Sequence, residues 1–222
     1  DSLKRASVAL KNNEIDVLVT APINKASIQE KVNSFIGHTE FLQGNFEGES
    51  LMIMVSKSMK IAFVTGHVPL TEVKKSITDK NIILKTKQLN TSLIQDFGIR
   101  MPKIAILGLN PHAGENGLLG EEENKCIIPA VKKLKKEGIM AFGPYPADSF
   151  FTSKNLGNFD GILSMYHDQG LTAFKTLSFS DGVNFTAGLN VVRTSPVHGT
   201  AYEIAGQGIA DEKSFREAVF MA

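Results

Sequence analysis

The chain has 222 residues, 42% hydrophobic and 21% charged, with a net charge of +1. This length suffices for one large or two small globular units. The net charge gives no basic surface for nucleic acid or an acidic membrane. No apolar run approaches the roughly 20 residues that span a bilayer. The single cysteine, Cys126, excludes an internal disulfide and is typical of the reducing cytoplasm, where we expect the protein to reside.

Strand and helix patterns alternate along the first half of the chain. The expected elements are a helix from the first residues, a strand over 15–20, a helix over 25–32, a helix that opens at 37–40, strands over 51–56 and 61–65 joined as a hairpin, and a long helix over 78–97. The chain begins at Asp1 inside a helical pattern and stops in mid-helix at 219–222. We therefore expect it to be a fragment of a longer protein.

The second half continues the alternation. We expect strands over 103–109, 140–143, 161–165 and 183–186, a loop over 114–120, and helices over 121–137, 171–177 and 213–221. Acids in the first turn and lysines in the last turn of the 121–137 helix match its macrodipole. The pattern predicts the α/β class, as an α/β/α sandwich whose mixed sheet is mostly parallel, with antiparallel strands near 51–65.

Three expected strands each end close to a histidine. His67 follows the 61–65 strand, His112 the 103–109 strand and His167 the 161–165 strand. Side chains that follow parallel strands meet at one sheet edge, and three neutral imidazoles suit a catalytic zinc, cobalt or similar divalent ion. A single loop histidine is more often only solvated. Asp168 is either an outer partner or acid–base group of that site, or the cap of a helix that starts near Leu171.

Five sequence blocks together resemble the 4-hydroxythreonine-4-phosphate dehydrogenase family. They are GHTEF at 37–41, LNPHAGE at 109–115, GPYPAD at 143–148, MYHDQG at 165–170 and RTSPVHGT at 193–200. The family's first third, roughly, has no counterpart in this chain. The resemblance implies an isocitrate/isopropylmalate dehydrogenase-like fold, with residues 1–222 forming most of one catalytic chain of two interleaved α/β subdomains. The sequence does not reveal their boundaries.

The resemblance also implies a function. Family members are cytoplasmic homodimers that use NAD and a divalent metal (Zn, Co or Mg) to oxidise 4-phosphooxy-L-threonine, with decarboxylation to 3-amino-2-oxopropyl phosphate, in pyridoxine (vitamin B6) biosynthesis. The metal positions fall on His67, His112 and His167. The substrate positions fall on His38, Thr39, Lys175, Asn184 and Arg193.

The residue types at those positions suit the chemistry. Lys175 and Arg193 are charge-assisted donors for the separated anionic groups of a phosphorylated amino acid, and Asn184 adds a neutral amide that orients the ligand. The base that takes the hydroxyl proton stays open among Asp148, Asp168 and Lys175.

The segment over 195–208 is similar to the His-Gly-Ser-Ala-Pro-Asp-Ile-Ala-Gly segment of isopropylmalate and isocitrate dehydrogenases, which surrounds the adenosine half of the nucleotide. This similarity places the cofactor at His198, Gly199, Thr200 and Glu203. An acid at Glu203 would bind a ribose diol and repel a 2′-phosphate, which favours NAD over NADP. The alternative is a glycine-bearing turn that leads into a surface helix.

Two other functions remain open at this stage. Close relatives of the family oxidise four-carbon sugar-acid phosphates, such as threonate or erythronate 4-phosphate, which carry a hydroxyl in place of the amine. A non-catalytic module that binds a phosphorylated metabolite would be favoured by loss of a metal ligand, and none is lost. Under every reading the partner is a small phosphorylated molecule, with no nucleic acid and no membrane.

Overall fold

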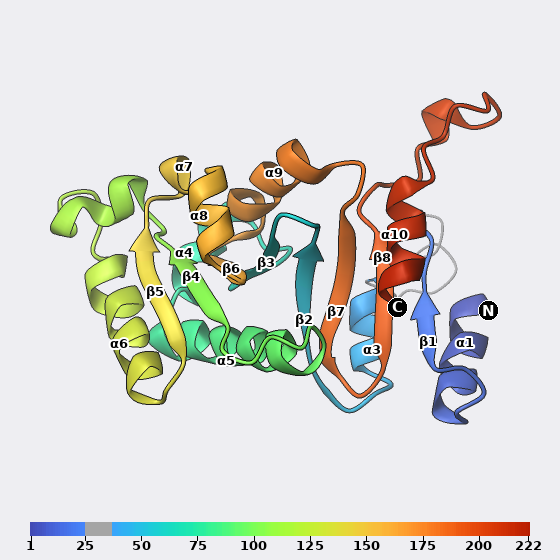
Figure 1. Cartoon of the computed structure of the whole chain (residues 1–222), viewed down its shortest axis with the longest axis horizontal. Helices are drawn as coiled ribbons and strands as arrows, with labels where there is room; N and C mark the ends of the chain where they lie inside the picture. Colours follow the sequence, from blue (N-terminus) through green and yellow to red (C-terminus); the bar gives the residue numbers. More distant parts are fainter. Residues whose placement is uncertain (25–36) are drawn as a thin grey trace. The chain divides into compact units, whose positions relative to one another are not determined.

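The computed structural model describes residues 1–24 and 37–222, and the chain divides into two compact units (Figure 1). Unit 1 is discontinuous in sequence, since it combines residues 1–52 with residues 179–222. Unit 2 is the continuous stretch 53–178. The helix expected over 25–32 lies outside the described residues.

Unit 1 is built on a small set of paired strands. Its elements are α1 (Ser2–Lys11), β1 (Val17–Val19), α3 (His38–Gln43), the first part of β2 (Gly48–Val55), β7 (Val183–Leu189), β8 (Val192–Pro196), the short turn η3 (Tyr202–Ile204) and α10 (Lys213–Met221). β8 pairs with β1 in parallel and with β7 antiparallel. The strand β8 and this antiparallel pair were not expected from the sequence, whereas α10 has the bounds that the sequence predicted.

Two glycines allow close backbone approach in unit 1. A Cβ on Gly48 would lie 2.0 Å from the carbonyl oxygen of Gly188, and a Cβ on Gly188 would lie 2.3 Å from that of Glu49. Both glycines also have positive φ, at +115° and +78°. No other residue fits where these two stretches meet.

Unit 2 holds most of the α/β pattern. Its elements are β3 (Lys60–Phe63), α4 (Leu70–Ser76), α5 (Asp79–Gln95), β4 (Lys103–Leu107), η1 (Pro111–Gly117), η2 (Glu123–Ile127), α6 (Ile128–Lys136), β5 (Met140–Tyr145), α7 (Ala147–Phe150), α8 (Ser153–Asn158), β6 (Gly161–Ser164) and α9 (His167–Ser178). Within the unit the strand order is β2-β3-β6-β4-β5. The β2–β3 hairpin is antiparallel and the other pairs are parallel, which confirms the predicted mixed, mostly parallel arrangement.

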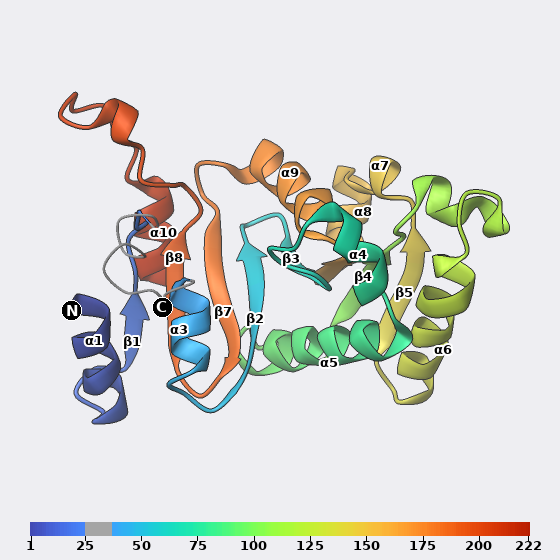
Figure 2. The same ribbon diagram turned by 180° about the vertical axis from the view of Figure 1, so that it is seen from behind.

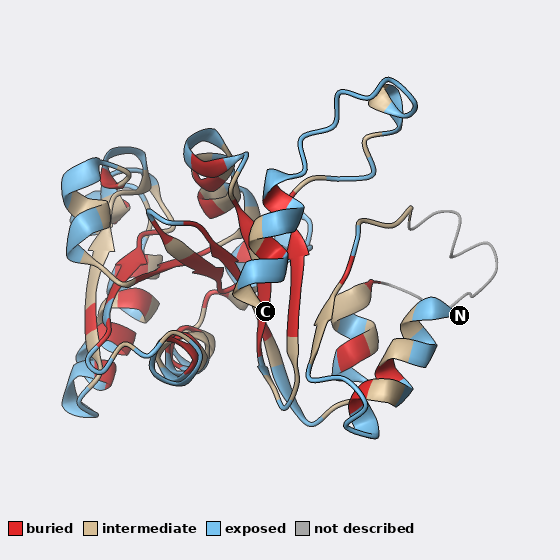
Figure 3. Cartoon of the chain, turned by 45° about the vertical axis from the view of Figure 1, so that its right-hand side comes forward, coloured by how far each residue is buried: buried red, intermediate tan, exposed pale blue. Residues whose placement is uncertain are grey.

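Helices cover both faces of the strands in unit 2. Figures 1 and 2, drawn from opposite sides, show α4 on one face and α8 on the other. The long helix α5 begins where the Thr78 hydroxyl accepts a hydrogen bond from the Asn81 backbone N–H at 3.2 Å, and its chain leaves through Gly98 at φ +67°. The side chains of Leu89 and Leu93 on α5 are fully buried. The buried residues, red in Figure 3, concentrate in the strands and the helix faces against them.

The structure corrects the expected start of one helix. α9 begins at His167 and not near Leu171, so Asp168 lies inside the first turn and cannot cap the helix. Gly170 lies within α9, where a larger residue would collide with the core. A Cβ there would lie 2.6 Å from Ile61 Cδ1 and 2.7 Å from Ser164 Oγ. The short helices α4, α7 and α8 were also not expected.

Three serines connect the two sequence ends of unit 2. Ser178, the last residue of the unit, donates from Oγ to Ser56 Oγ at 2.9 Å, and its Oγ lies 3.3 Å from Ser58 Oγ. Ser56 itself lies three positions after the unit begins. The entry and exit of unit 2 are therefore side by side.

Candidate functional site

Two of the predicted metal ligands lie together at the carboxyl ends of neighbouring strands. His67 follows β3 and His167 follows β6, and their ring centroids are 5.1 Å apart. The Phe63 ring stacks on His167 with a centroid distance of 5.8 Å. Thr65 donates from Oγ1 to the Met165 carbonyl at 3.0 Å, which ties the two strand ends to each other.

His112 lies on η1, the tight left-handed turn that follows β4. The φ angles of His112, Ala113, Glu115 and Asn116 are all positive, between 43° and 57°. Each such residue costs about 1–2 kcal/mol, so this conformation must be held by its surroundings. Among residues 1–24 and 37–222 no group of three or more His, Cys, Asp or Glu side chains is placed to hold one ion. The three-histidine site thus stays a prediction.

The three predicted acid–base residues are all on helices of unit 2. Asp168 Oδ1 lies 2.6 Å from His167 Nδ1, a contact that can orient the imidazole. Asp148 is exposed on α7. Lys175 is half-buried on α9, seven positions after Asp168 and on the same face of the helix.

Two polar side chains that the sequence did not single out hold the strand ends. Gln169 accepts from the Met165 backbone N–H and donates to the Gly108 carbonyl, both at 2.7 Å. Glu123 accepts from the backbone N–H groups of Leu109 and Asn110, both at 2.8 Å. In the sequence, Glu123 is one of several acids in the first turn of an expected helix. Only its burial in the structure distinguishes it from the other acids of that turn.

Glu122 connects the same loop to α4. Its carboxylate accepts from Lys74 Nζ and from Asn110 Nδ2, both at 2.8 Å. The hydrogen bond from Lys74, followed by that from Asn110, lowers the pKa of Glu122 to about 2.

Unit 1 contains a buried cation. Arg193 on β8 is only 4% exposed, and it donates from Nε and Nη2 to the Thr20 hydroxyl at 3.0 and 2.7 Å and from Nη1 to the Thr186 hydroxyl at 3.2 Å. It forms no salt bridge with any carboxylate of the described residues. Burial lowers the pKa of Arg193 to about 10, and the charge of Glu40 opposes that shift. A buried guanidinium held by neutral hydroxyls alone is suited to receive an anion.

Strand pairing places Asn184 on the same face as Arg193. Arg193 is paired with Thr186 in the β7–β8 register, and Asn184 lies two residues before Thr186 on β7. The Asn184 Oδ1 atom is buried and accepts no hydrogen bond from the described residues. An orphaned acceptor beside a buried cation fits a ligand that carries both a donor and an anionic group. His38 and Thr39 are the first residues of α3 in the same unit.

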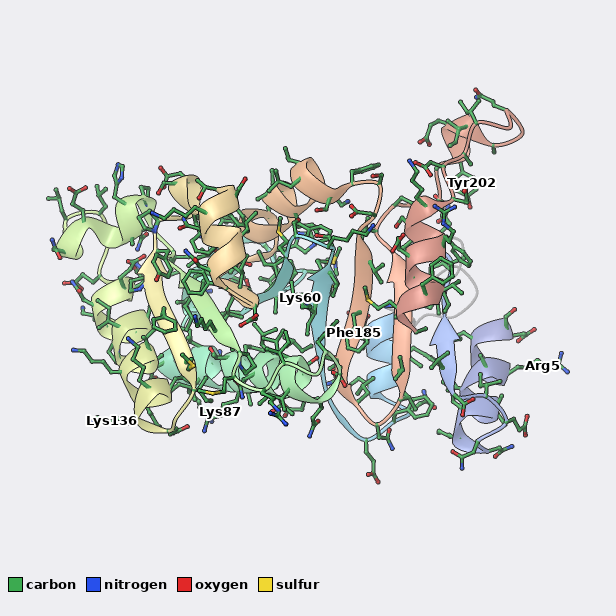
Figure 4. All side chains as sticks on the ribbon, viewed as in Figure 1. Arg5, Lys60, Lys87, Lys136, Phe185 and Tyr202 are labelled. Carbon is green, nitrogen blue, oxygen red and sulfur yellow. The ribbon has the colours of Figure 1, made fainter. Side chains whose placement is uncertain are left out.

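The predicted cofactor residues follow β8 in unit 1. His198 is half-buried, and its Nδ1 lies 2.8 Å from the Gly199 carbonyl oxygen. Gly199, Thr200 and Glu203 are exposed, and so is the neighbouring Tyr202, which Figure 4 labels. No described helix is both long enough and apolar enough to cross a membrane.

The comparisons with known proteins agree with one another. The sequence matches the family described as pyridoxal phosphate biosynthetic protein PdxA over residues 1–222. A 4-hydroxythreonine-4-phosphate dehydrogenase of Bacteroides thetaiotaomicron is 53% identical over 224 residues, which cover 100% of this chain and 61% of the relative. One from Marinobacter nauticus is 45% identical over 99% of this chain and 66% of the relative. The chain thus spans less than two thirds of the length of these two relatives.

Solved structures extend the likeness to the fold. The crystal structure of 4-hydroxythreonine-4-phosphate dehydrogenase from Klebsiella pneumoniae matches with a TM-score of 0.85 at 33% identity, over 99% of this chain and 66% of that one. The isocitrate dehydrogenase of Methylococcus capsulatus matches 99% of this chain and 80% of its own with a TM-score of 0.55 at 12% identity, which shows a shared fold alone. Both matches confirm the predicted fold class.

Proposed function

Because the chain belongs to the family of the pyridoxal phosphate biosynthetic protein PdxA, we propose that it oxidises 4-phosphooxy-L-threonine, with decarboxylation to 3-amino-2-oxopropyl phosphate. The single observation that carries this proposal furthest is Arg193, a buried guanidinium with hydroxyl partners and no salt bridge to the described residues. Such a group binds a carboxylate or a phosphate, and the substrate has both. The names of the relatives support the same reaction.

The proposed substrate-binding residues carry the charges and hydrogen-bonding groups that a phosphorylated amino acid requires. In unit 1, Arg193 grips an anionic group of the substrate, and the free Oδ1 of Asn184 accepts a hydrogen bond from its amine. His38 and Thr39 add contacts to that end. In unit 2, Lys175 is either a cation of the type that binds a phosphate or carboxylate or, in its neutral form, a proton acceptor.

The proton of the oxidised hydroxyl leaves to an acid–base group of unit 2. Asp168, Asp148 and Lys175 are the proposed acceptors, and Asp168 also fixes the tautomer of His167 through the 2.6 Å contact to Nδ1. A nicotinamide dinucleotide, when bound, accepts the hydride. Its proposed contacts are His198, Gly199, Thr200 and Glu203.

A divalent metal fits the donor types that follow β3, β6 and β4. His67, His167 and His112 would hold it, and the first two rings already lie 5.1 Å apart. When bound, the ion supplies Lewis acidity at the substrate hydroxyl and later at the decarboxylating keto acid. Zinc, cobalt and magnesium are the proposed ions, and a cytoplasmic homodimer is the proposed form.

The experiment that tests the function is NADH formation by the full-length, metal-loaded protein. We would measure 4-phosphooxy-L-threonine and threonate 4-phosphate side by side, each with and without a chelator. Chelator-sensitive turnover of the amino acid alone supports the proposal. Turnover of the sugar acid alone would move the protein to the sugar-acid relatives, and no turnover of either would favour a binding module.

A further inference from the structure

Glu123 is the one fully buried carboxylate among residues 1–24 and 37–222, with 2% of its surface exposed. No lysine, arginine or histidine of that part of the chain forms a salt bridge with it. Burying a charge without a counterion is expensive unless its hydrogen bonds are complete. The partners of this carboxylate therefore indicate its role.

All of those partners belong to the loop that carries His112. Glu123 Oε1 accepts from the backbone N–H groups of Leu109 and Asn110 at 2.8 Å each, and Oε2 accepts from Asn110 Nδ2 at 2.9 Å. Charge-assisted bonds of this kind are stronger than neutral ones. The carboxylate thus fixes the two residues that lead from β4 into η1.

The loop is also shaped around the carboxylate by two glycines. A Cβ on Gly114 would lie 2.5 Å from Glu123 Oε2, and a Cβ on Gly108 would lie 3.2 Å from Glu123 Oε1 and 2.9 Å from Ala113 Cα. Gly114 has a φ of +78° as well. Larger residues at either position would displace the carboxylate or the loop.

His112 lies inside the turn that this arrangement closes. The Asn110 carbonyl accepts a hydrogen bond from the Ala113 backbone N–H at 3.1 Å. Pro111 and His112 are therefore the two central residues of a hydrogen-bonded turn. The left-handed φ of His112, +53°, is unfavourable in a free chain. Glu123 anchors Leu109 and Asn110 at the start of this loop, next to Gly108, whose carbonyl accepts from Gln169.

We propose that Glu123 is a positioning residue for His112, which holds the imidazole in place for the divalent metal. This rests on the proposed function, since it takes His112 as a metal ligand. The metal contacts His112, and Glu123 acts only through the backbone of Leu109 and Asn110.

The test is a metal titration of the full chain in four forms: wild type, Glu123→Gln, His112→Ala and the double variant. The Kd for Zn²⁺ and Co²⁺ is measured by calorimetry, and hydrogen exchange follows the Leu109 and Asn110 amides. A glutamine at 123 must turn its NH₂ group toward a backbone N–H or toward Asn110 Nδ2, donor against donor. We expect Glu123→Gln to weaken metal binding roughly 10- to 100-fold and to accelerate exchange at both amides. The double variant should bind no more weakly than His112→Ala alone.

Glu121→Gln is the matched control, because Glu121 is an exposed acid two positions away that pairs with Lys125. It should change neither the Kd nor the exchange. If circular dichroism shows that Glu123→Gln does not fold, Asn110→Ala is the alternative variant. It removes only the side-chain donor to Glu123 Oε2 and Glu122. A smaller loss of metal affinity is then expected.

A Glu123→Gln or Asn110→Ala protein that lowers Tm but keeps the wild-type Kd would reduce Glu123 to a purely structural residue. An additive loss in the double variant would also overturn the proposal. Wild-type protein that binds no metal would remove both this role and the metal site. Metal binding without oxidation of 4-phosphooxy-L-threonine would overturn the substrate assignment alone.

Discussion

Gln169 joins the ends of two parallel strands through a hydrogen bond from its Nε2 to the Gly108 carbonyl, with a length of 2.7 Å. Its Oε1 accepts from the Met165 backbone N–H at the same distance. Gly108 directly follows β4 and Met165 directly follows β6. One side chain therefore fixes the spacing of the two strand ends that precede His112 and His167.

Gln169→Leu should destabilise the protein. The substitution keeps a similar volume but leaves the Met165 N–H and the Gly108 carbonyl without partners, which costs about 1–3 kcal/mol. The measurement is the free energy of unfolding in urea. Gln207→Leu is the control, because Gln207 is exposed and its side chain donates to the Glu203 carbonyl within the same turn. Equal losses in the two variants would refute the bridging role of Gln169.

Arg193→Met should separate binding from stability. The variant removes the buried cation, so we expect substrate affinity to fall on the order of 100-fold. The free energy of unfolding should fall by no more than about 1 kcal/mol, because the desolvation cost of an unpaired charge disappears with it. Arg5→Met serves as the control, since Arg5 is exposed on α1 of the same unit (Figure 4). A large loss of stability with unchanged affinity would mean that Arg193 is a structural residue.

Glu122 should make stability depend on acid pH. Its pKa is lowered from 4.5 to about 2 in the folded chain, mainly by Lys74. A depressed carboxyl pKa contributes stability that is fully present above pH 4.5 and is lost as the pH falls toward 2. The difference in urea midpoint between wild type and Glu122→Gln should therefore shrink over that window. It should also shrink with added salt, because Lys74 is exposed.

In the matching control, Glu72→Gln removes an exposed ion pair with Lys75 on the same helix. It should have little effect at any pH. If the Glu122→Gln difference stays constant from pH 6 to pH 2, the Lys74–Glu122 pair does not act in solution.

Glu203→Gln should relax the choice of coenzyme. If Glu203 faces the ribose, loss of its charge removes a repulsion of about 1 kcal/mol or more toward a 2′-phosphate. The ratio of kcat/KM for NAD to that for NADP should then fall on the order of tenfold. Glu212→Gln, another exposed acid of the same unit, should leave the ratio unchanged. An unchanged ratio in Glu203→Gln would place the ribose elsewhere.

The sequence predicted helices and strands correctly where local patterns and tertiary packing agree. The apolar run at 161–165 predicted β6, and the apolar run at 103–109 predicted β4. Thr78 and Gly98 marked the two ends of α5 correctly. These elements follow from burial and capping, which depend on neighbours in the sequence.

Prediction from the sequence was wrong where long-range contacts override the local pattern. β8 contains Arg193, Ser195 and Pro196, a polar pattern that favours a loop, yet all three are buried between β1, β7 and α10. For the candidate site, the resemblance identified residue types, but it could not reveal that Glu123 is buried or that Gln169 spans two strands. Those roles arise only when separate segments meet.

The hydrogen bond between Ser56 and Ser178 has a consequence for how the chain is synthesised. Unit 2 leaves the ribosome before β7, β8 and α10 exist, so it can fold while β1 still lacks its partner strand. Its two ends are then tethered to each other, and the long stretch between residues 17 and 192 shrinks to a short effective loop. The entropic cost of the late β1–β8 pairing is thereby reduced. Folding of the middle of the chain during synthesis therefore favours the later pairing of the N-terminal β1 with the C-terminal β8.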